Sequence, residues 1–597
     1  MPSSSTTIYA TKELSINNAK AFVHAMNAEE DSSTVKRSTI LYCVIGRSNA
    51  WAEDPVPDQT DDTDQYLRYN IHREFIGAKK INDSDCSHVT TRYDWNTGTV
   101  YSMYRDTDED VYARATWVLT DEYNVYKCLY NNKGAASTIK PNGFSTLPFT
   151  TSDGYTWKYI YSVSLGEAEK FLTPSHMPVK TISAGDGSIE SDRQLAVQNA
   201  AVNGSIQVVE TVNVGSGYHM VANGVVEAGG RDSLKMSAAG DNPPSPIDNY
   251  YNGSSVYVLS GTGAGQLRRV IDYSGATKTL TVNTAFATTC NTDSRIIISP
   301  TVTFIGDGAG AKAYSRVDTS TGAISNVAVI AVGQDYTRAT VLITSNNIHG
   351  AGVTANAVIS PVGGHGSDPI RELGADRLML TVKYNGTEGI SANGNGYIPS
   401  NTEFRTISIL KDPVLKVDAN NNTTTIENVA NTSNSPAALR LTTRMGISYN
   451  QMEGSDPKNP LVVGDILTNE RNRLRAEIGE LEFVTELGPV ARSSAALVNA
   501  VKSANGNVVY IREDETESDP SFYTVYANDV DSYSDYAAFT KDDIILKSTS
   551  ETKVATVEAI KGPEANTYSG EILFTENIQP VTRDPKQIED IKIILDF

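Results

Sequence analysis

The chain ends with SGEILFTENIQPVTRDPKQIEDIKIILDF, Ser569 to Phe597, and this stretch carries the strongest fold signal in the sequence. In the final EDIKIILDF, apolar and charged residues alternate as they do in a half-buried β-strand. One side would carry Ile591, Ile593, Leu595 and Phe597, and the other Asp590, Lys592 and Asp596, with Ile594 as the exception. Chain ends are usually loose and polar, so this end predicts a strand that is paired into a sheet and covered on one face. We therefore expect the last residue to belong to a hydrophobic core. The domain with that core need not be the one that immediately precedes the strand in the sequence.

Length and composition indicate a soluble protein of several domains. The 597 residues suffice for about three or four domains. A hydrophobic fraction of 39% with 20% charged residues is typical of globular chains. The net charge of −21 argues against a nucleic-acid binder, because phosphate contacts need clustered Lys and Arg. The acidic balance favours solubility and partners with neutral or basic surfaces.

Neither a targeting segment nor a covalent framework is predicted. The start, MPSSSTTIYATKEL, is polar and lacks the apolar region of a secretory signal. The longest apolar stretches, such as ILYCVIG, are too short to span a membrane. The cysteines are too widely spaced for a disulfide framework or a zinc knuckle, at Cys43, Cys86, Cys128 and Cys290. We expect folding in a reducing cytosol.

The first third of the chain is predicted to contain one helix followed by short strands. Leu14 to Glu30 has apolar residues at helical spacing, and Ser15 is in position to cap the helix. Short runs of β-branched and aromatic residues predict strands in TILYCVIG, TVYSMY, ATWVLT, NVYKCLY and YTWKYIYSV. All four tryptophans precede residue 160, and after Ile182 the chain becomes rich in small and β-branched residues. This shift predicts a domain boundary near residue 185.

A divergent repeat lies beyond that boundary. NGSIQVVETVNVGSGYHMV and TGAISNVAVIAVGQDYTRA superpose without gaps, with Gly204 on Gly322 and Tyr218 on Tyr336. Each copy predicts a turn glycine, two short strand pieces, a glycine-containing bend and a tyrosine, in small β units joined by tight turns. Further along, VVGDILTNERNRLRAEI and TKDDIILKSTSETKVATVEAI indicate two related hairpins.

Two glycine runs raise the possibility of a phosphate site. GTGAGQ (Gly261 to Gln266) and GDGAGA (Gly306 to Ala311) resemble part of a dinucleotide fingerprint. That fingerprint needs G-x-G-x-x-G between a strand and a helix, whereas the residues after both runs alternate like strands. Hairpin turns are therefore the favoured interpretation over nucleotide sites.

Acidic runs and histidines give no metal or catalytic pattern. DTDED (Asp106 to Asp110) starts like an EF-hand loop, but Val111 replaces the required glycine and Trp117 the bidentate glutamate. A solvated loop is favoured there and in DQTDDTDQ (Asp58 to Gln65), with loose cation binding as the alternative. No H-x-x-x-H pair links His24, His72, His88, His176, His219, His349 and His365.

We predict no catalytic, cofactor-binding or metal-binding residues and no enzymatic activity. No G-x-S-x-G elbow occurs. A Cys–His pair assembled by the fold, and a carboxylate pair for glycoside cleavage, stay open. Tyr outnumbers Phe by 30 to 13, which suits exposed strand faces and packing against neighbouring subunits alike.

Several stretches resemble one known family. VIGRSNAW, TRYDW, NVYKCL, DGYTWKYIYSV, FRTISILKDP and the terminal segment are similar, in the same order, to the baseplate wedge protein of T-even-type contractile-tailed phages, the product of their gene 8. The signature residues are Gly46, Arg47, Ser48, Trp51, Arg92, Asp94, Trp95, Tyr126, Cys128, Gly154, Tyr155, Trp157, Phe404, Arg405, Pro413, Ser569, Gly570, Glu571, Glu576, Asn577 and Phe597.

The resemblance implies an α+β, β-dominated, multi-domain fold. Residues 1–185, 372–413 and 565–597 would form a discontinuous wedge core. The segments 186–371 and 414–564 have little or no counterpart in the shorter T-even member and would be inserted small β-sandwich or barrel-like domains. Insertion at exposed loops costs little entropy, about 0.6 kcal/mol for each doubling of loop length.

The resemblance also implies a structural role without cofactors, membrane or nucleic acid. The family member is a homodimeric wedge subunit that contacts other wedge proteins, of the gene product 6, 7 and 10 types, and takes part in the baseplate's change of shape on host attachment. The resemblance therefore implies that the protein is synthesised in the host bacterial cytoplasm and resides in the tail baseplate of the virion.

The rival interpretation is a tail fibre or spike that binds or cleaves host surface glycans through the inserted β domains. Adhesins usually place the variable tip at the C-terminus, whereas here the family-like strand is C-terminal.

Overall fold

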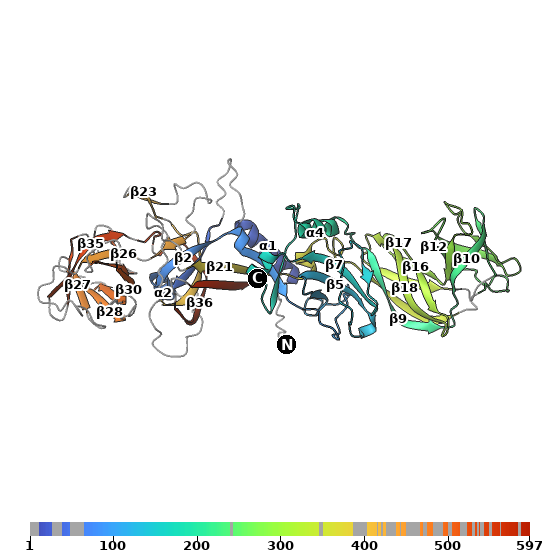
Figure 1. Ribbon diagram of the computed structural model, residues 1–597, viewed down its shortest axis with the longest axis horizontal. Helices are drawn as coiled ribbons and strands as arrows, with labels where there is room; N and C mark the ends of the chain where they lie inside the picture. Colours follow the sequence, from blue (N-terminus) through green and yellow to red (C-terminus); the bar gives the residue numbers. More distant parts are fainter. Residues whose placement is uncertain are drawn as a thin grey trace, which may run out of the picture. The chain divides into compact units, whose positions relative to one another are not determined.

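Two compact β-rich units make up the chain: Met1–Ile16 with His88–Arg377 (unit 1), and Asn17–Ser87 with Leu378–Phe597 (unit 2). The computed structural model describes residues 11–26, 39–47, 65–238, 243–345, 350–385, 403–414, 416–419, 422–425, 438–441, 443–448, 466–469, 475–480, 494–499, 504–513, 522–527, 532–533, 536–537, 542–547, 552–561, 563–566, 568–582 and 587–597. Its helices are α1 (Lys12–Met26), α2 (Gln65–Arg73), α3 (Leu165–Phe171), α4 (Ile189–Asn199) and α5 (Pro369–Glu372). Strands prevail, in several sheets and two closed barrels, so the β-dominated α+β fold is confirmed (Figure 1).

Unit 2 contains an antiparallel sheet with the strand order β25-β2-β1-β22-β36. The strands of this sheet are β1 (Leu41–Gly46), β2 (Phe75–Ile81), β22 (Glu403–Lys411), β25 (Ala438–Arg440) and β36 (Glu571–Thr582). Two further strands, β21 (Arg377–Asn385) and β37 (Ile588–Asp596), are not part of it. β1 pairs with β2 on one side and β22 on the other, so it lies at the centre of the sheet. All six of its residues are buried, as its continuous apolar run predicts.

The C-terminal strand β37 packs into the core of unit 2, beside β21. Ile591 and Ile593 are buried with Leu41 in one hydrophobic cluster. The Phe597 ring lies 5.4 Å from the ring of Phe22 in α1. The predicted closing strand is therefore confirmed, because segments near the two ends of the chain share one interior.

The other described strands of unit 2 form a closed barrel and two short pairs. The barrel order is β26-β31-β30-β29-β28-β27-β34-β35 (Figure 1). The strands are β26 (Thr443–Ser448), β27 (Ile466–Asn469), β28 (Arg475–Glu480), β29 (Ser494–Asn499), β30 (Ala504–Glu513), β31 (Phe522–Ala527), β34 (Ile544–Lys547), β35 (Thr552–Lys561), and the pairs β23 (Lys416–Ala419) with β24 (Asn422–Thr425) and β32 (Ser532–Tyr533) with β33 (Tyr536–Ala537). The two predicted hairpins are confirmed as β27–β28 and β34–β35, and β27 also pairs with β34.

Unit 1 contains a four-stranded sheet with the order β4-β5-β7-β6 and a separate pairing of β3 with β8. The bounds are β3 (Cys86–Thr91), β4 (Trp117–Leu119), β5 (Asn124–Asn131), β6 (Phe149–Thr150), β7 (Tyr155–Ser162) and β8 (His176–Val179). The predicted strand in TVYSMY is wrong. Tyr101, Met103 and Tyr104 pack against the sheet as a buried irregular segment, and its amides make single bonds instead of a ladder, Ser102 to Ala115 and Tyr104 to Cys128.

The predicted start of α1 is also wrong. The helix begins at Lys12, and the Thr11 hydroxyl accepts a hydrogen bond from the Leu14 amide at 3.3 Å. Ser15 is buried within the helix, and Thr11, also a favoured capping residue type, is the cap instead. The predicted apolar stripe is confirmed by the complete burial of Ile16 and Ala19.

A six-stranded antiparallel sheet and a closed barrel follow in unit 1 (Figure 1). The sheet order is β18-β17-β16-β19-β20-β9, and the barrel order is β10-β11-β14-β13-β12-β15. The bounds are β9 (Ile206–Ser216), β10 (Val221–Gly229), β11 (Ser233–Met236), β12 (Ser255–Ser260), β13 (Leu267–Ser274), β14 (Thr279–Val282), β15 (Arg295–Ser299), β16 (Thr301–Gly306), β17 (Ala309–Asp318), β18 (Ala323–Gln334), β19 (Ala339–Thr344) and β20 (Ala351–Ile359). The barrel is thus inserted between two strands of one sheet, β9 and β16.

The sequence repeat is a structural repeat, although each copy is one long strand and not two short pieces. β9 and β18 are the repeated strands, and they stand at opposite ends of the sheet order. Each has two β-bulges, where one residue has no partner on the neighbouring strand. These residues are Gln207 and Val212 in β9, and Ser325 and Ile330 in β18. These residues occupy equivalent positions in the two copies. Because the bulges interrupt the regular alternation of each long strand, the sequence pattern predicted two short strands in its place.

The two copies also exchange contacts at their ends. The Tyr218 amide donates to the Gly322 carbonyl at 2.8 Å, and the Tyr336 amide donates to the Gly204 carbonyl at 3.1 Å. Both glycines have positive φ, +58° at Gly204 and +67° at Gly322. Each turn therefore needs glycine for its backbone conformation and for the close approach of the other copy.

We expect Gly204→Ala to lower the free energy of unfolding of unit 1 by about 3 kcal/mol or more. A methyl group there would lie 2.5 Å from the backbone of Tyr336, so crowding adds to the cost of positive φ. Gly265→Ala is the control, because Gly265 has φ +89° and no atom within 4 Å of an added methyl. It should cost only about 1 kcal/mol. Calorimetry of both full-length variants measures the difference, and equal shifts would contradict the close-approach argument.

Two segments placed within the predicted insertions pack on neighbouring sheets. Val197 of α4 belongs to the cluster that contains Trp157 of the four-stranded sheet. Leu439 of β25 pairs with Ala78 of β2. The boundaries of the two compact units differ from those predicted for the core and its insertions. The predicted domain boundaries stay a prediction.

Candidate functional site

Signature residues of unit 2 gather at one end of its five-stranded sheet. Gly46 pairs with Thr406 of β22, which in turn pairs with Asn577 of β36. A side chain on Gly46 would lie 2.7 Å from the Thr406 hydroxyl, so the strands approach closely only because this residue is glycine. The other signature residues near this end are Phe404, Arg405 and Glu576, of which the first two are buried.

A second group lies where β22 leaves the sheet and β36 enters it. The Ser569 hydroxyl accepts a hydrogen bond from the Val414 amide at 3.0 Å, next to the buried Pro413. Gly570 has φ +85°. Glu571 forms an ion pair with Lys411 at 3.0 Å, between the first residue of β36 and the last of β22. These signature residues fix how the last segment joins the sheet.

Arg47 binds Glu74, a partner that the sequence analysis missed. The Arg47 amide donates to the Glu74 carbonyl at 2.9 Å, and its guanidinium donates to both carboxylate oxygens at 2.9 and 3.1 Å. Burial raises the pKa of the Glu74 carboxyl, which Arg47 only partly offsets. Nothing in the sequence near Glu74 signals this pairing. Ser48 and Trp51 lie outside the described residues.

The signature residues of unit 1 serve its four-stranded sheet. Arg92 forms an ion pair with Asp94 at 2.7 Å and donates to the Thr173 carbonyl at 3.0 Å. The Trp95 indole donates to Ser137 at 3.2 Å. The buried signature residues of the sheet are Tyr126, Cys128, Tyr155 and Trp157, and Gly154 precedes β7 with φ +84°.

The glycine runs are hairpin turns, as predicted. GTGAGQ joins the paired strands β12 and β13, and GDGAGA joins β16 and β17. Gly261, Gly263 and Gly265 all have positive φ. The Gln266 amide group closes the first turn by donating to the carbonyls of Gly263 and Thr288.

The acidic run Asp106–Asp110 lies in a loop, as predicted. The Asp106 carboxylate accepts a hydrogen bond from the Ile359 amide at 3.3 Å, and Asp108 forms an ion pair with Arg114 at 3.4 Å. The second acidic run lies outside the described residues, except for Gln65, which begins α2.

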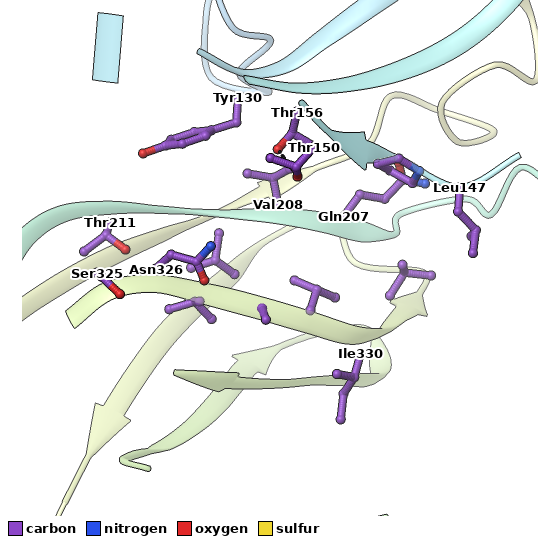
Figure 2. Close-up of a pocket in the computed structure, with 16 residues that line it drawn as sticks. Tyr130, Leu147, Thr150, Thr156, Gln207, Val208, Thr211, Ser325, Asn326 and Ile330 are labelled. Carbon is purple, nitrogen blue, oxygen red and sulfur yellow. Dashed lines mark hydrogen bonds between the residues drawn. The ribbon is translucent and has the colours of Figure 1, made fainter. Parts of the chain in front are cut away.

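The candidate binding site is a groove of about 360 Å³ in unit 1. Figure 2 shows its sixteen lining residues. Thr150 of β6 and Tyr130 and Thr156 of the adjoining strands lie on one side of β9, and Ser325 and Asn326 lie on the β18 side. The remaining lining residues are Leu147, Pro148, Gln207, Val208, Val209, Thr211, Val327, Ala328, Val329, Ile330 and Val332. None of the sixteen carries a charge.

Strand edges and bulges shape this groove. β6, β9 and β18 are each the last strand at an end of their sheet. Three of the four bulged residues of the repeat line the groove, Gln207, Ser325 and Ile330. The side-chain oxygen of Gln207 is buried without a hydrogen-bond partner. The groove can therefore offer polar backbone, hydroxyl and amide groups between apolar walls, which suits binding.

Unit 1 contains a buried cluster of charged and titratable side chains, formed by Lys127, His365 and Glu372. Glu372 accepts hydrogen bonds from His365 Nδ1 at 2.6 Å and from the Gly366 amide at 2.5 Å. The ammonium group of Lys127 donates to the Thr116 hydroxyl at 3.1 Å and to the Glu372 carbonyl at 3.3 Å.

Burial governs the charges of this cluster. It lowers the pKa of Lys127 to about 8 and also lowers the pKa of His365, which stays neutral. Burial alone would raise the pKa of Glu372, but His365 and Lys127 hold it below its usual value. Glu372 is therefore a carboxylate. All three side chains are buried, so the cluster lies in the interior of unit 1.

The described residues were compared with the requirements of a metal site and of a membrane-spanning helix. Among these described residues, no three His, Cys, Asp or Glu side chains come together as a metal site would need. None of the helices described is long and apolar enough to cross a membrane. Comparison of the sequence with protein-family models and with curated proteins finds no match.

Proposed function

We propose that this chain is a structural, non-enzymatic subunit of the baseplate wedge of a contractile phage tail. The observation that carries the proposal is the place of the terminal strand. Ile591 and Ile593 complete a core begun by β1, as the resemblance to the wedge family implies. The signature residues that the structure describes support it further, since they serve the sheets of both units.

In this proposal the protein acts as a homodimeric scaffold and switch. Interfaces above about 2,000 Å² would hold it to a second copy and to the other wedge proteins. Receptor binding would be transmitted by a shift between two packings of the assembly. No cofactor is required.

A cryo-EM map of the tail of the phage that encodes the chain tests this proposal. We expect paired copies in each wedge around the tail tube. Density at the tip of a fibre would favour the glycan-binding alternative. Specific release of reducing ends from host envelope polysaccharide by the purified chain would contradict a non-enzymatic scaffold.

A further inference from the structure

Unit 1 contains four Asn–Gly sequences, which differ in how firmly the fold holds them. They are Asn142–Gly143, Asn203–Gly204, Asn223–Gly224 and Asn252–Gly253. An asparagine side chain loses its amide most readily before glycine, because glycine has no Cβ to crowd the approach of its own backbone nitrogen. The reaction needs an unrestrained asparagine side chain and a glycine nitrogen that is able to attack it. The contacts of each pair therefore decide whether it reacts in the folded protein.

The Asn203–Gly204 pair is held by hydrogen bonds on both sides. The side-chain nitrogen of Asn203 donates to Asp335 at 3.3 Å, and its side-chain oxygen accepts from the Gly363 amide at 2.9 Å. Gly204 is buried, and its carbonyl accepts from the Tyr336 amide at 3.1 Å. Attack on the Asn203 side chain would require these bonds to break first.

The two pairs in the barrel are also restrained. The Gly253 amide donates to the Val270 carbonyl at 2.9 Å, so the nitrogen that would attack Asn252 is already engaged. The Asn223–Gly224 pair lies within β10, and its glycine is paired with β15. In both places the backbone must leave the barrel before it is able to react.

The Asn142–Gly143 pair has none of these restraints. It lies in the irregular segment that leads into β6, and Asn142 is exposed. Among the described residues, neither the Asn142 side chain nor the Gly143 amide has a hydrogen-bond partner. A methyl group placed on Gly143 would meet no described atom within 4 Å, so the space around the reacting groups is open. The Gly143 carbonyl, beyond the reacting nitrogen, accepts from the Tyr126 hydroxyl at 3.1 Å.

We propose that Asn142 is a site of spontaneous modification, converted in the folded protein to aspartate and isoaspartate with water as the co-reactant. Hydroxide removes the proton of the Gly143 nitrogen, which attacks the side-chain carbonyl carbon of Asn142. A new C–N bond closes a succinimide ring, while the bond from that carbon to Nδ2 breaks and ammonia leaves with a proton from water. Water then opens the ring at either carbonyl, so the backbone runs either normally or through the former side chain. The reaction is independent of the proposed function.

Either product changes the surface of this loop. It adds a carboxylate two positions after Lys140, whose ammonium group already pairs with Asp121 at 2.7 Å. Isoaspartate also inserts a carbon into the main chain just before Phe144, and the Arg193 guanidinium lies 3.5 Å from the centre of that ring. The modification therefore adds negative charge beside an aromatic contact that fixes the loop.

Ageing of the purified full-length chain tests the inference. The protein is incubated at neutral and mildly alkaline pH, and the acid form of each Asn–Gly peptide is quantified by mass spectrometry. Trypsin should release residues 134–158 in one piece, because Lys140 precedes proline, and Asn142 is the only asparagine there. We expect Asn142 to react at least tenfold faster than the other three, since a local opening of about 1.4 kcal/mol already slows a site tenfold. The rate should rise with pH, because hydroxide starts the reaction.

Two controls separate the fold from the sequence. In denaturant the four pairs should react at similar rates, so that the advantage of Asn142 disappears. Asn142→Gln should keep its amide, because glutamine would have to close a larger ring. Formation of isoaspartate together with aspartate in the Asn142 peptide would support the ring, and aspartate alone would contradict it. Reaction of Asn142 no faster than the other pairs in the folded chain, or an advantage that persists after unfolding, would overturn the inference.

Discussion

Deletion of Ile591–Phe597 is expected to make the chain insoluble. The deletion removes two buried isoleucines, Ile591 and Ile593, and exposes the apolar cluster that they cover. Loss of a buried isoleucine costs about 2–5 kcal/mol, and whole domains are stable by only about 5–15 kcal/mol. Solubility after expression, compared with the full chain, measures the effect. A shortened chain that stays soluble and assembles normally would show that the last strand does not close the core.

Point variants of adjacent isoleucines test the same argument without a truncation. Ile593→Ala should lower the free energy of unfolding of unit 2 by about 3 kcal/mol, because Ile593 is only 6% exposed. Ile594→Ala is the matched control, since Ile594 is 37% exposed and points away from the cluster. It should cost about 1 kcal/mol or less. Equal losses would mean that the alternation of the strand has no structural meaning.

Glu372→Gln should have an effect of similar size in unit 1. The Glu372 carboxylate accepts hydrogen bonds from His365 and the Gly366 amide, and its charge acts on the buried Lys127 and Lys158. Removing one charge from such a buried polar cluster costs about 3–5 kcal/mol. Glu227→Gln is the control, because Glu227 pairs with Lys235 at the surface, where ion pairs contribute about 0–1 kcal/mol.

The pH dependence of this difference identifies its origin. The pKa of Glu372 is lower in the folded protein than its usual 4.5, so its contribution to stability is fully present above that value. Below it, the contribution fades as the folded carboxyl takes up a proton. Chemical denaturation at several pH values should therefore show the full difference between wild type and Glu372→Gln at pH 7, and a shrinking one below about pH 4.5. A difference independent of pH would indicate lost packing instead of lost charge.

The sequence predicts best where one short segment carries its own signal. The alternation after Asp590 placed the last strand in a core, because period-two burial is local. The glycines of GTGAGQ predicted a hairpin, because positive φ is a property of single residues. The repeat was visible through Gly204 and Gly322, whose conformations are equivalent.

Short helices were missed although two of them had a signal. α3 follows Ser164, which forms a capping box with Glu167, and α4 follows Ser188, whose hydroxyl accepts from the Ser191 amide. The S-x-x-E pattern at Ser164 would have indicated the first helix. Both helices are short, and their apolar residues are too few for a periodic pattern.

The groove and the charged cluster could not be predicted in this way. Lys127 contacts Glu372 across 245 positions of sequence, and such pairings have no local pattern. A lone lysine within NVYKCLY was the one available hint of a buried charge. The groove depends on which strands end a sheet, and that order is a property of the complete fold.

Native-state hydrogen exchange tests the central claim most directly, that the last strand and the first strand of unit 2 share one interior. Amide opening energies are compared for peptides that cover β37 and β1. The account predicts that both are strongly protected and respond by the same amount when Ile593→Ala weakens the shared cluster. Fast exchange of β37, or protection of β1 that ignores the substitution, would contradict it.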